Sequence, residues 1–180
     1  QSIRFRLGRG ALPFCTDNTK WTFGLAVANQ YSFGPSDQSL ARRSFGFRER
    51  LRILYVIPGS PAHEAGLQSG DYIARVNGAT IQPGADAKSR YLSAADWRSG
   101  QPIELVIDRN GLKKTTLTPV RACDFKIKMT QSQRVAALAR KDGILVSKGM
   151  LWFAGEHELA FVIAHELVHL MRNHLRMIGK

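Results

Sequence analysis

The chain has no apolar run long enough to cross a membrane. Its longest one, from Leu159 to Met171, is shorter than the roughly 18–20 residues that a spanning helix needs, and it contains two histidines and a glutamate. The first residues, Gln-Ser-Ile-Arg, lack the basic-then-apolar order of a secretory signal peptide. The sequence therefore predicts neither a transmembrane helix nor a signal peptide within these 180 residues.

Cysteine is scarce, with only Cys15 and Cys123 present. Neither belongs to a CxxC pair or has a histidine nearby in the sequence, which argues against a cysteine metal site. A bond between them would close a loop of about 100 residues and contribute about 4–5 kcal/mol in the chain-entropy model. We favour this disulfide, which indicates an oxidising compartment. The alternative is two unrelated buried thiols.

Acidic residues are also few, 14 against 26 Lys and Arg, so the net charge is +12. Such a charge can attract nucleic acid or an anionic membrane surface. The basic residues are scattered along the sequence, and no nucleic-acid motif accompanies them. We favour a solvated basic surface, no nucleic-acid partner, and membrane-surface association as a minor alternative. The 44% hydrophobic content predicts a globular protein of one or two small domains.

The most informative segment that is present is His165-Glu166-Leu167-Val168-His169. Histidines four residues apart on a helix lie about 40° apart around its axis, so both imidazoles can bind one zinc ion. Glu166 can act as general base on the attacking water, and the pattern is a metalloprotease signature. Apolar residues occur almost all round this helix, so we expect it to be buried. The alternative is a core helix whose histidines bond to backbone carbonyls.

The other histidines do not complete a zinc site. By helical spacing, His174 faces the opposite side of the helix and His157 lies too far along the axis. A catalytic zinc normally has three protein ligands and one open position. We therefore expect the third ligand on a later helix that this chain lacks, and we interpret the chain as a fragment.

The segment between the cysteines predicts short strands and helices separated by glycine turns. Four short motifs occur in order: Pro58-Gly59-Ser60-Pro61-Ala62, Ala65-Gly66-Leu67, Gly70-Asp71-Tyr72-Ile73 and Val76-Asn77-Gly78. Together they resemble a PDZ domain of the kind found in bacterial periplasmic HtrA proteases. We expect strands at Thr22–Val27, Arg52–Ile57, Asp71–Val76, Ile103–Asp108 and Leu112–Pro119, and helices at Ser39–Phe45, Pro61–Ala65 and Ala85–Trp97.

This resemblance implies a peptide-binding groove. The turn Phe23-Gly24-Leu25 would offer backbone N–H groups to a peptide carboxylate, and the peptide would add as a strand beside the helix Ala85–Trp97. The alternative is a PDZ fold that only positions other parts and binds nothing.

The remainder of the chain resembles metallopeptidase family forty-eight, the gluzincins of membranes and periplasm. The resemblance rests on Gly143 to Leu151, Glu158-Leu159-Ala160 and the histidine motif. It implies His165 and His169 as metal ligands, Glu166 as catalytic base, one zinc per complete site and a glutamate as third ligand. It also implies that Ile144, Leu145 and Val146 form a sheet edge along which substrate lies, and that cysteines such as Cys15 and Cys123 flank an inserted PDZ domain.

Together these features predict an α+β protein in three parts. An N-terminal segment, 1–19, packs on the catalytic part; a PDZ domain, a partly open β-barrel capped by helices, covers 20–121; and a partial zinc peptidase domain covers 122–180. We expect a periplasmic or cell-envelope zinc endopeptidase that acts on protein or peptide substrates, with little activity in this form. The alternatives are a peptide-binding module with a vestigial peptidase, a membrane-embedded site-two-type protease, and a basic nucleic-acid binder.

Overall fold

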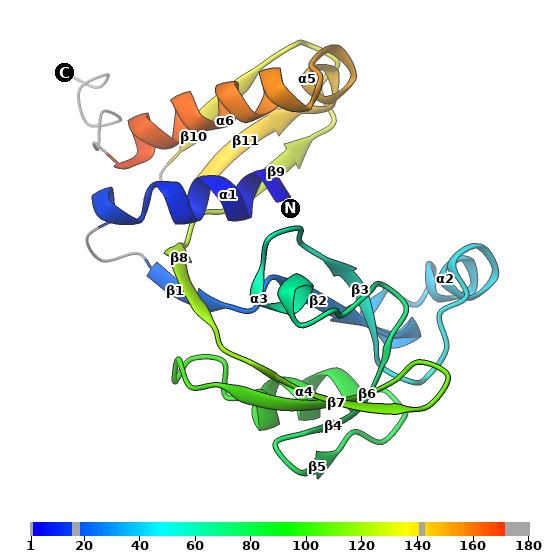
Figure 1. Ribbon diagram of the computed structural model, residues 1–180. Coiled ribbons are helices and arrows are strands. Elements are labelled where there is room, and N and C mark those ends of the chain that lie inside the picture. Colours follow the sequence, from blue (N-terminus) through cyan, green and yellow to red (C-terminus); the bar gives the residue numbers. More distant parts are fainter. Residues whose placement is uncertain (1, 16–18, 141–142, 172–180) are drawn as a thin grey trace. The chain divides into compact units, whose positions relative to one another are not determined.

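A computed structural model describes residues 2–15, 19–140 and 143–171 of the chain (Figure 1). The chain divides into two compact units. One is Trp21–Val120; the other combines the described residues of Gln1–Lys20 with those of Arg121–Lys180. The strands β1 (Thr19–Thr22) and β8 (Val120–Cys123) pair with each other where the chain enters and leaves the first unit.

The unit Trp21–Val120 is built on one sheet with the strand order β2-β3-β4-β6-β7, to which β5 adds beside β4. The β2–β3, β3–β4, β4–β6 and β6–β7 pairs are antiparallel. Its elements are β2 (Leu25–Ala28), η2 (Gln30–Ser32), α2 (Gln38–Phe45), β3 (Arg52–Val56), α3 (Pro61–Glu64), β4 (Tyr72–Val76), β5 (Ala79–Thr80), α4 (Ala87–Ala95), β6 (Ile103–Asp108) and β7 (Leu112–Leu117).

Strand β6 shows why this sequence forms the core of the unit. Ile103, Leu105 and Ile107 are at most 1% exposed, while the residues between them are only half-buried. A period of two puts the apolar side chains on one face of the sheet. The hairpin to β7 turns at Asn110 and Gly111, both with positive φ, as the Asn-Gly pair predicts.

One predicted strand is interrupted. We expected a continuous strand over Thr22–Val27, but β1 ends at Thr22 and β2 begins at Leu25. Gly24 has a φ of 74°, in the left-handed region that favours glycine. The chain therefore turns at Phe23-Gly24, and the expected strand becomes two strands that pair with different partners, β8 and β3.

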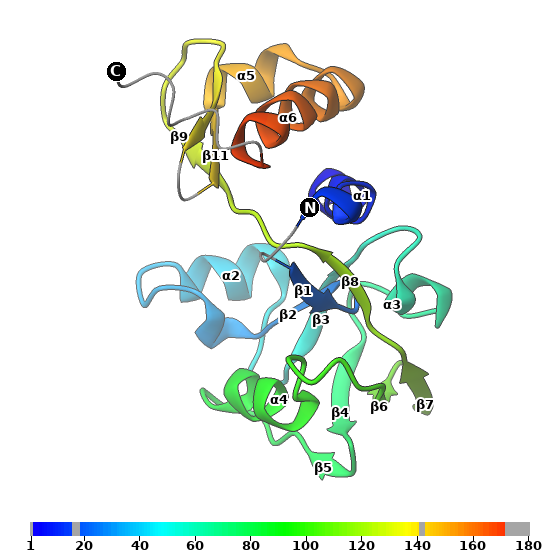
Figure 2. The ribbon, with the colours of Figure 1, turned by 90° about the vertical axis from the view of Figure 1, so that its left-hand side faces the viewer.

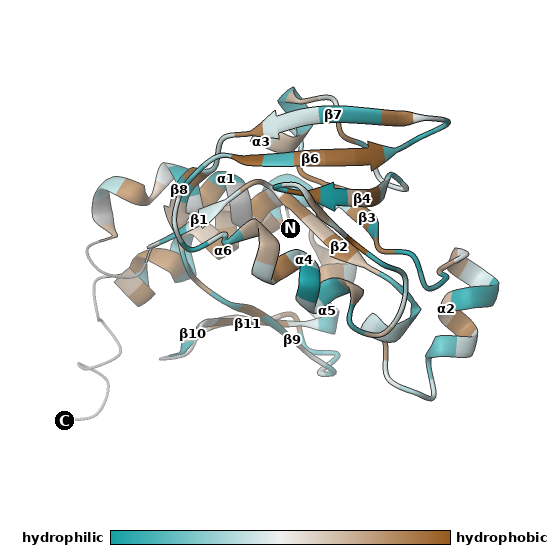
Figure 3. Ribbon diagram, turned by 90° about the horizontal axis from the view of Figure 1, so that it is seen from below, coloured by the Kyte–Doolittle hydropathy of each residue, from teal (hydrophilic) through white to brown (hydrophobic). Residues whose placement is uncertain are grey.

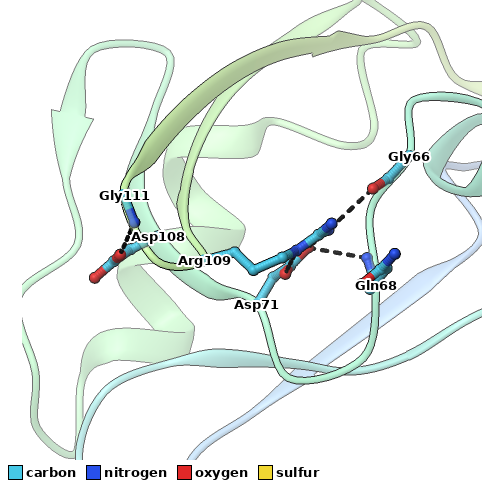
Figure 4. Close-up of polar contacts among 6 residues, drawn as sticks. All are labelled: Gly66, Gln68, Asp71, Asp108, Arg109 and Gly111. Atoms are coloured by element: carbon cyan, nitrogen blue, oxygen red, sulfur yellow. Dashed lines mark hydrogen bonds and ion pairs between the residues drawn. The ribbon is translucent and has the colours of Figure 1, made fainter.

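A buried carboxylate ties the start of β4 to the β6–β7 hairpin (Figure 4). Asp71 is 2% exposed, and its carboxylate accepts hydrogen bonds from the Arg109 guanidinium and, at 2.9 Å, from the Gln68 amide. The Arg109 guanidinium also donates to the Gly66 carbonyl at 2.9 Å. The hydrogen bond to Asp71 raises the pKa of Arg109 above its usual value. Because the carboxylate is buried, removing its cationic partner would leave an unpaired charge in the core.

The second unit packs helices on a three-stranded sheet with the order β10-β11-β9. β10 is antiparallel to β11, and β9 is parallel to it. The elements are α1 (Ser2–Gly10), η1 (Leu12–Phe14), β9 (Ile127–Thr130), β10 (Ala137–Arg140), β11 (Gly143–Ser147), α5 (Lys148–Phe153) and α6 (Glu156–Met171). Figure 2 shows α6 beside the sheet, and α6 contacts β10, β11 and α1.

A disulfide joins Cys15 and Cys123 in this unit, with their Cα atoms 5.9 Å apart, and confirms the predicted pairing. Both cysteines belong to the apolar cluster that also contains Ile144 and Leu167. The bond therefore fastens the N-terminal segment to the core beneath α6. In the described part of the chain, no helix is both long and apolar enough to span a membrane.

Helix α6 is not buried all round, contrary to our expectation. Only Ile163 and Leu167 are buried, whereas Phe161 is 75% exposed and Val168 42% exposed. The apolar composition of the helix suggested full burial, but the described residues of this unit pack against one face only. We expected other residues to cover the opposite face of α6 as well, but no residues in the described part of this unit do so.

Candidate metal centre

His165 and His169 converge on a common point, one turn apart on α6. Their Nε2 atoms lie 3.0 Å apart, and their ring centroids are 4.7 Å apart. Two imidazole nitrogens that each lie about 2.1 Å from one zinc ion, at a tetrahedral angle, would be about 3.4 Å apart. A shift of a few tenths of an ångström thus converts the observed separation into a chelating one. The donor set, two imidazoles on a rigid helix, fits zinc.

Glu166 lies between the two histidines in sequence and points toward the sheet. Its Oε2 accepts a hydrogen bond of 2.7 Å from the backbone N–H of Ala139 in β10. The side chain is half-buried, so this bond fixes the carboxylate without removing it from solvent. Sequence reasoning missed Ala139, because 27 residues separate the two partners and no local pattern marks the pair.

The strand next to this carboxylate is β10 rather than the one we expected. The resemblance placed Ile144, Leu145 and Val146 at a sheet edge, but β11 lies between β10 and β9 and pairs with both. Ile144 and Val146 are at most 2% exposed, as suits a β-branched central strand. The edge expectation for β11 is therefore wrong.

In β10, the backbone groups of alternate residues point away from β11. The amide of Ala139 donates to Glu166 and not to β11, and the carbonyl of Ala136 accepts from Ser147. Since antiparallel pairs alternate between bonded and non-bonded positions, Ala137 and Ala139 present their backbone groups at the outer edge.

No set of three metal-binding side chains occurs among residues 2–15, 19–140 and 143–171. His157 is exposed near the start of α6, and His63 is on α3 in the other unit. His174, which helical spacing excluded as a ligand, lies outside the described residues. The described part of the site thus consists of two histidines and the adjacent glutamate.

The predicted carboxylate-binding turn is held by internal hydrogen bonds. The Gly24 amide donates to Thr22 Oγ1 at 3.1 Å, and the Gly24 carbonyl accepts from Ile57 at 2.8 Å. The hydroxyl of Ser60, which is fully buried, also donates to the Gly24 carbonyl at 3.3 Å. Phe23 is buried, and its carbonyl accepts from Ala62 at 3.0 Å.

Strand β2, which begins at Leu25, is the first strand in the sheet order and lies at its edge among the described residues. Helix α4 places Tyr91 in the core of the same unit, where burial raises the pKa of this side chain to about 12. The turn at Gly24 thus leads directly into an edge strand, and the Gly24 amide already has an internal acceptor, Thr22 Oγ1.

Two family models match overlapping parts of the chain. Residues 52–109 match the family model of the PDZ domain, and residues 104–179 match that of peptidase family M48. A protein of Thermotoga maritima named "Putative zinc metalloprotease" is 45% identical over 65 residues, which are 36% of this chain and 12% of that protein. The chain thus matches about an eighth of the length of this relative.

Solved structures similar to the chain include a PDZ domain and a serine endoprotease. The HtrA3 PDZ domain bound to a phage-derived ligand is 22% identical, with a TM-score of 0.38, over 57% of this chain and 88% of that one. A serine endoprotease from Yersinia pestis is 20% identical, with a TM-score of 0.38, over 59% and 30% of the two chains. The family matches carry the assignment: the chain combines a PDZ domain with a segment that resembles the zinc peptidases of peptidase family M48.

Proposed function

We propose that this protein contributes the front of a zinc endopeptidase site, with His165 and His169 as two of the metal ligands. The convergence of the two Nε2 atoms to 3.0 Å carries this proposal. A third ligand would come from residues that the structure does not describe, because the described ones contain no group of three. The match of residues 104–179 to a zinc peptidase family supports the same reading.

Glu166 is the proposed general base. When bound between the histidines, zinc would supply Lewis-acid activation of water and of the scissile carbonyl. Glu166 would take the proton from the attacking water and pass it to the leaving amine. The hydrogen bond from the Ala139 amide holds the carboxylate on the sheet side of α6.

The outer edge of β10 is the proposed substrate strand. Ala137 and Ala139 present backbone groups at this edge, and Glu166 is bonded to the second of them. The Ala139 amide already donates to Glu166, so a substrate in extended conformation could pair with the Ala137 groups and the Ala139 carbonyl. It would then pass directly beside the Glu166 carboxylate. This proposal replaces Ile144, Leu145 and Val146, whose strand has no free edge among the described residues.

The PDZ unit is proposed to bind the C-termini of protein or peptide substrates. A peptide would add to the edge of β2, beside α4, with its carboxylate at the turn Phe23-Gly24-Leu25. The Gly24 amide donates to Thr22 Oγ1, so a bound carboxylate would have to replace that hydroxyl as acceptor. We place the protein in the periplasm or cell envelope, since a disulfide suits an oxidising compartment.

The metal assignment can be tested by competition for zinc against a chromophoric chelator. His165→Ala and His169→Ala should each weaken zinc binding by at least 100-fold, because each removes half of the described ligands. His157→Ala, an exposed histidine on the same helix, is the matched control and should leave binding unchanged. Zinc affinity unaffected by His165→Ala would overturn the site.

The catalytic role needs a separate measurement. In a form of the protein with measurable zinc-dependent proteolysis, Glu166→Gln should reduce the rate by about 10²–10⁴-fold while zinc stoichiometry is retained. The 180-residue chain by itself should cleave casein slowly or not at all, since the structure describes only two ligands. An unchanged rate in Glu166→Gln would refute Glu166 as the general base. Zinc binding without proteolysis in any longer form of the protein would instead favour a peptide-binding module with a vestigial peptidase.

A further inference from the structure

The segment that connects β2 and β3 carries an unusual concentration of positive charge. Over residues 38–52, which we call the arginine arm, the sequence has five arginines and one acidic residue, Glu49. The arginines are Arg42, Arg43, Arg48, Arg50 and Arg52. Glu49 accepts a hydrogen bond of 2.8 Å from the Tyr31 hydroxyl. The basic residues that look scattered in the whole sequence are therefore dense in this one place.

Helix α2 displays part of this charge on its outward side. Its only buried residue is Ala41, which packs in a small apolar cluster with Ala28 and Phe47. At 100° per residue, the side opposite Ala41 carries Arg42 and Arg43. Figure 3 shows hydrophilic and hydrophobic residues side by side along this helix.

Two apolar side chains flank these arginines. Leu40 and Phe45 are 51% and 63% exposed, and by helical angle each lies about 60° from one of the two arginines. Leu40 and Phe45 thus lie on either side of the two arginines, and the exposed surface of α2 combines two cations with two apolar groups.

The C-terminal end of α2 gathers more cations. Arg48 donates to the Arg42 carbonyl at 3.3 Å, and Arg52 donates to the Phe45 carbonyl while its guanidinium lies 4.0 Å from the centre of the Phe47 ring. These contacts hold both guanidinium groups beside the last turn, where the helix dipole favours positive charge.

Only one of the five arginines has a carboxylate partner in the described part of the chain. Arg50 pairs with Asp108 at 2.8 Å, and this pair lowers the pKa of Asp108. The remaining four form no ion pair with any residue that the structure describes. The arm thus presents uncompensated charge.

We propose that the arginine arm binds the surface of an anionic phospholipid bilayer. Guanidinium groups match phosphate oxygens in bidentate geometry, and each cation near such a surface strengthens binding. Leu40 and Phe45 would enter the boundary between headgroups and acyl chains, as the apolar residues of interfacial helices do. Charge alone would also suit nucleic acid, but a phosphate backbone offers no apolar phase for these two exposed side chains. The proposal does not depend on the peptidase site.

Flotation with vesicles of phosphatidylglycerol and phosphatidylcholine tests this with the whole 180-residue chain. The chain should float with mixed vesicles at low salt and stay behind with pure phosphatidylcholine. Each arginine near the surface is worth about fivefold in partitioning, so Arg42→Gln with Arg43→Gln should lower it about 25-fold. Lys113→Gln with Lys114→Gln, on β7, removes the same charge elsewhere in the unit and is the matched control.

The apolar contribution is tested by Leu40→Ser with Phe45→Ser, which keeps every charge. This variant should also bind vesicles at least tenfold more weakly, because it lacks the two apolar side chains that would enter the membrane interface. Circular dichroism should show all three variants folded, since the substituted residues are exposed. The proposal would be overturned if the Arg42/Arg43 variant and the Lys113/Lys114 variant lost equal amounts of vesicle binding. Binding to duplex DNA that depends on Arg42 and Arg43 but not on Leu40 and Phe45, without vesicle binding, would also overturn it.

Discussion

Removing the disulfide tests whether the two units unfold independently. Replacing Cys15 and Cys123 by serine cuts the covalent link that fastens the N-terminal segment to the unit containing α6. In the chain-entropy model, the loss depends on the length of loop that the bond closes in the unfolded chain. The sequence separation is 108 residues, which corresponds to about 4.8 kcal/mol if the whole chain unfolds together.

The expected loss is smaller if the PDZ unit stays folded. Trp21–Val120 then acts as a rigid insert whose ends are paired through β1 and β8. The flexible part of the loop shrinks to residues 15–20 and 121–123, about ten residues, and the same model gives about 2.7 kcal/mol. We expect this second value, because each unit has its own apolar core.

Native-state hydrogen exchange distinguishes the two values, since it reports opening free energies element by element. Amides of β11 and α6 should lose about 2.7 kcal/mol of protection in the serine variant, and those of β4 and β6 less than about 0.5 kcal/mol. Equal losses near 4.8 kcal/mol in both units would refute independent unfolding. A change below about 1 kcal/mol in β11 would refute the role of the disulfide in restraining the unfolded chain.

Two further predictions concern the PDZ unit. Gly24→Ala should lower the free energy of unfolding by about 1–3 kcal/mol more than Gly59→Ala does. Both glycines have positive φ, but a Cβ at Gly24 would lie 2.1 Å from the Cβ of Ser60, whereas a Cβ at Gly59 would meet nothing within 4 Å. Equal losses in urea unfolding would contradict that close approach. The raised pKa of Tyr91, about 12, predicts that stability falls as pH rises from about 10 to about 12, where the unfolded chain loses this proton first, by about 2–3 kcal/mol in total. Tyr91→Phe should remove this part of the pH dependence; an unchanged slope would show that another group causes it.

The parts of the fold that could be predicted are those with local signals. The strand expected at Ile103–Asp108 has the same bounds as β6, because strict alternation of apolar residues between turn residues leaves little ambiguity. The turn at Asn77-Gly78 has positive φ at both residues, as this pair requires. The continuous strand expected at Thr22–Val27 from its apolar residues was wrong, because the chain turns at Gly24. Only the PDZ resemblance implied a turn at Phe23-Gly24-Leu25, and the close approach of Ser60 accompanies it.

In the candidate site, the geometry of the two histidines has a local sequence signal, whereas the contact of the glutamate does not. The approach of His165 and His169 follows from four-residue spacing on one helix, so a short motif was enough to predict it. The partner of Glu166 depends on which strand packs under α6, and this in turn depends on the order β10-β11-β9. No local sequence pattern predicts the order of the strands. We predicted β11 at the edge of the sheet, but its apolar residues suit the centre of the sheet.

The exposed face of α6 follows from the same reasoning. An apolar sequence predicts that a helix is buried, but it does not identify the residues that pack against it. Phe161 lies one turn before His165, so its 75% exposure leaves an apolar side chain on the helix face that bears the proposed metal ligands. Anything that supplies a third ligand to these histidines must approach across this face, and burying Phe161 would contribute about 1.5–3 kcal/mol to that approach. Completing the metal site and covering the helix would then be one event, so zinc affinity and protection of the α6 amides should rise together.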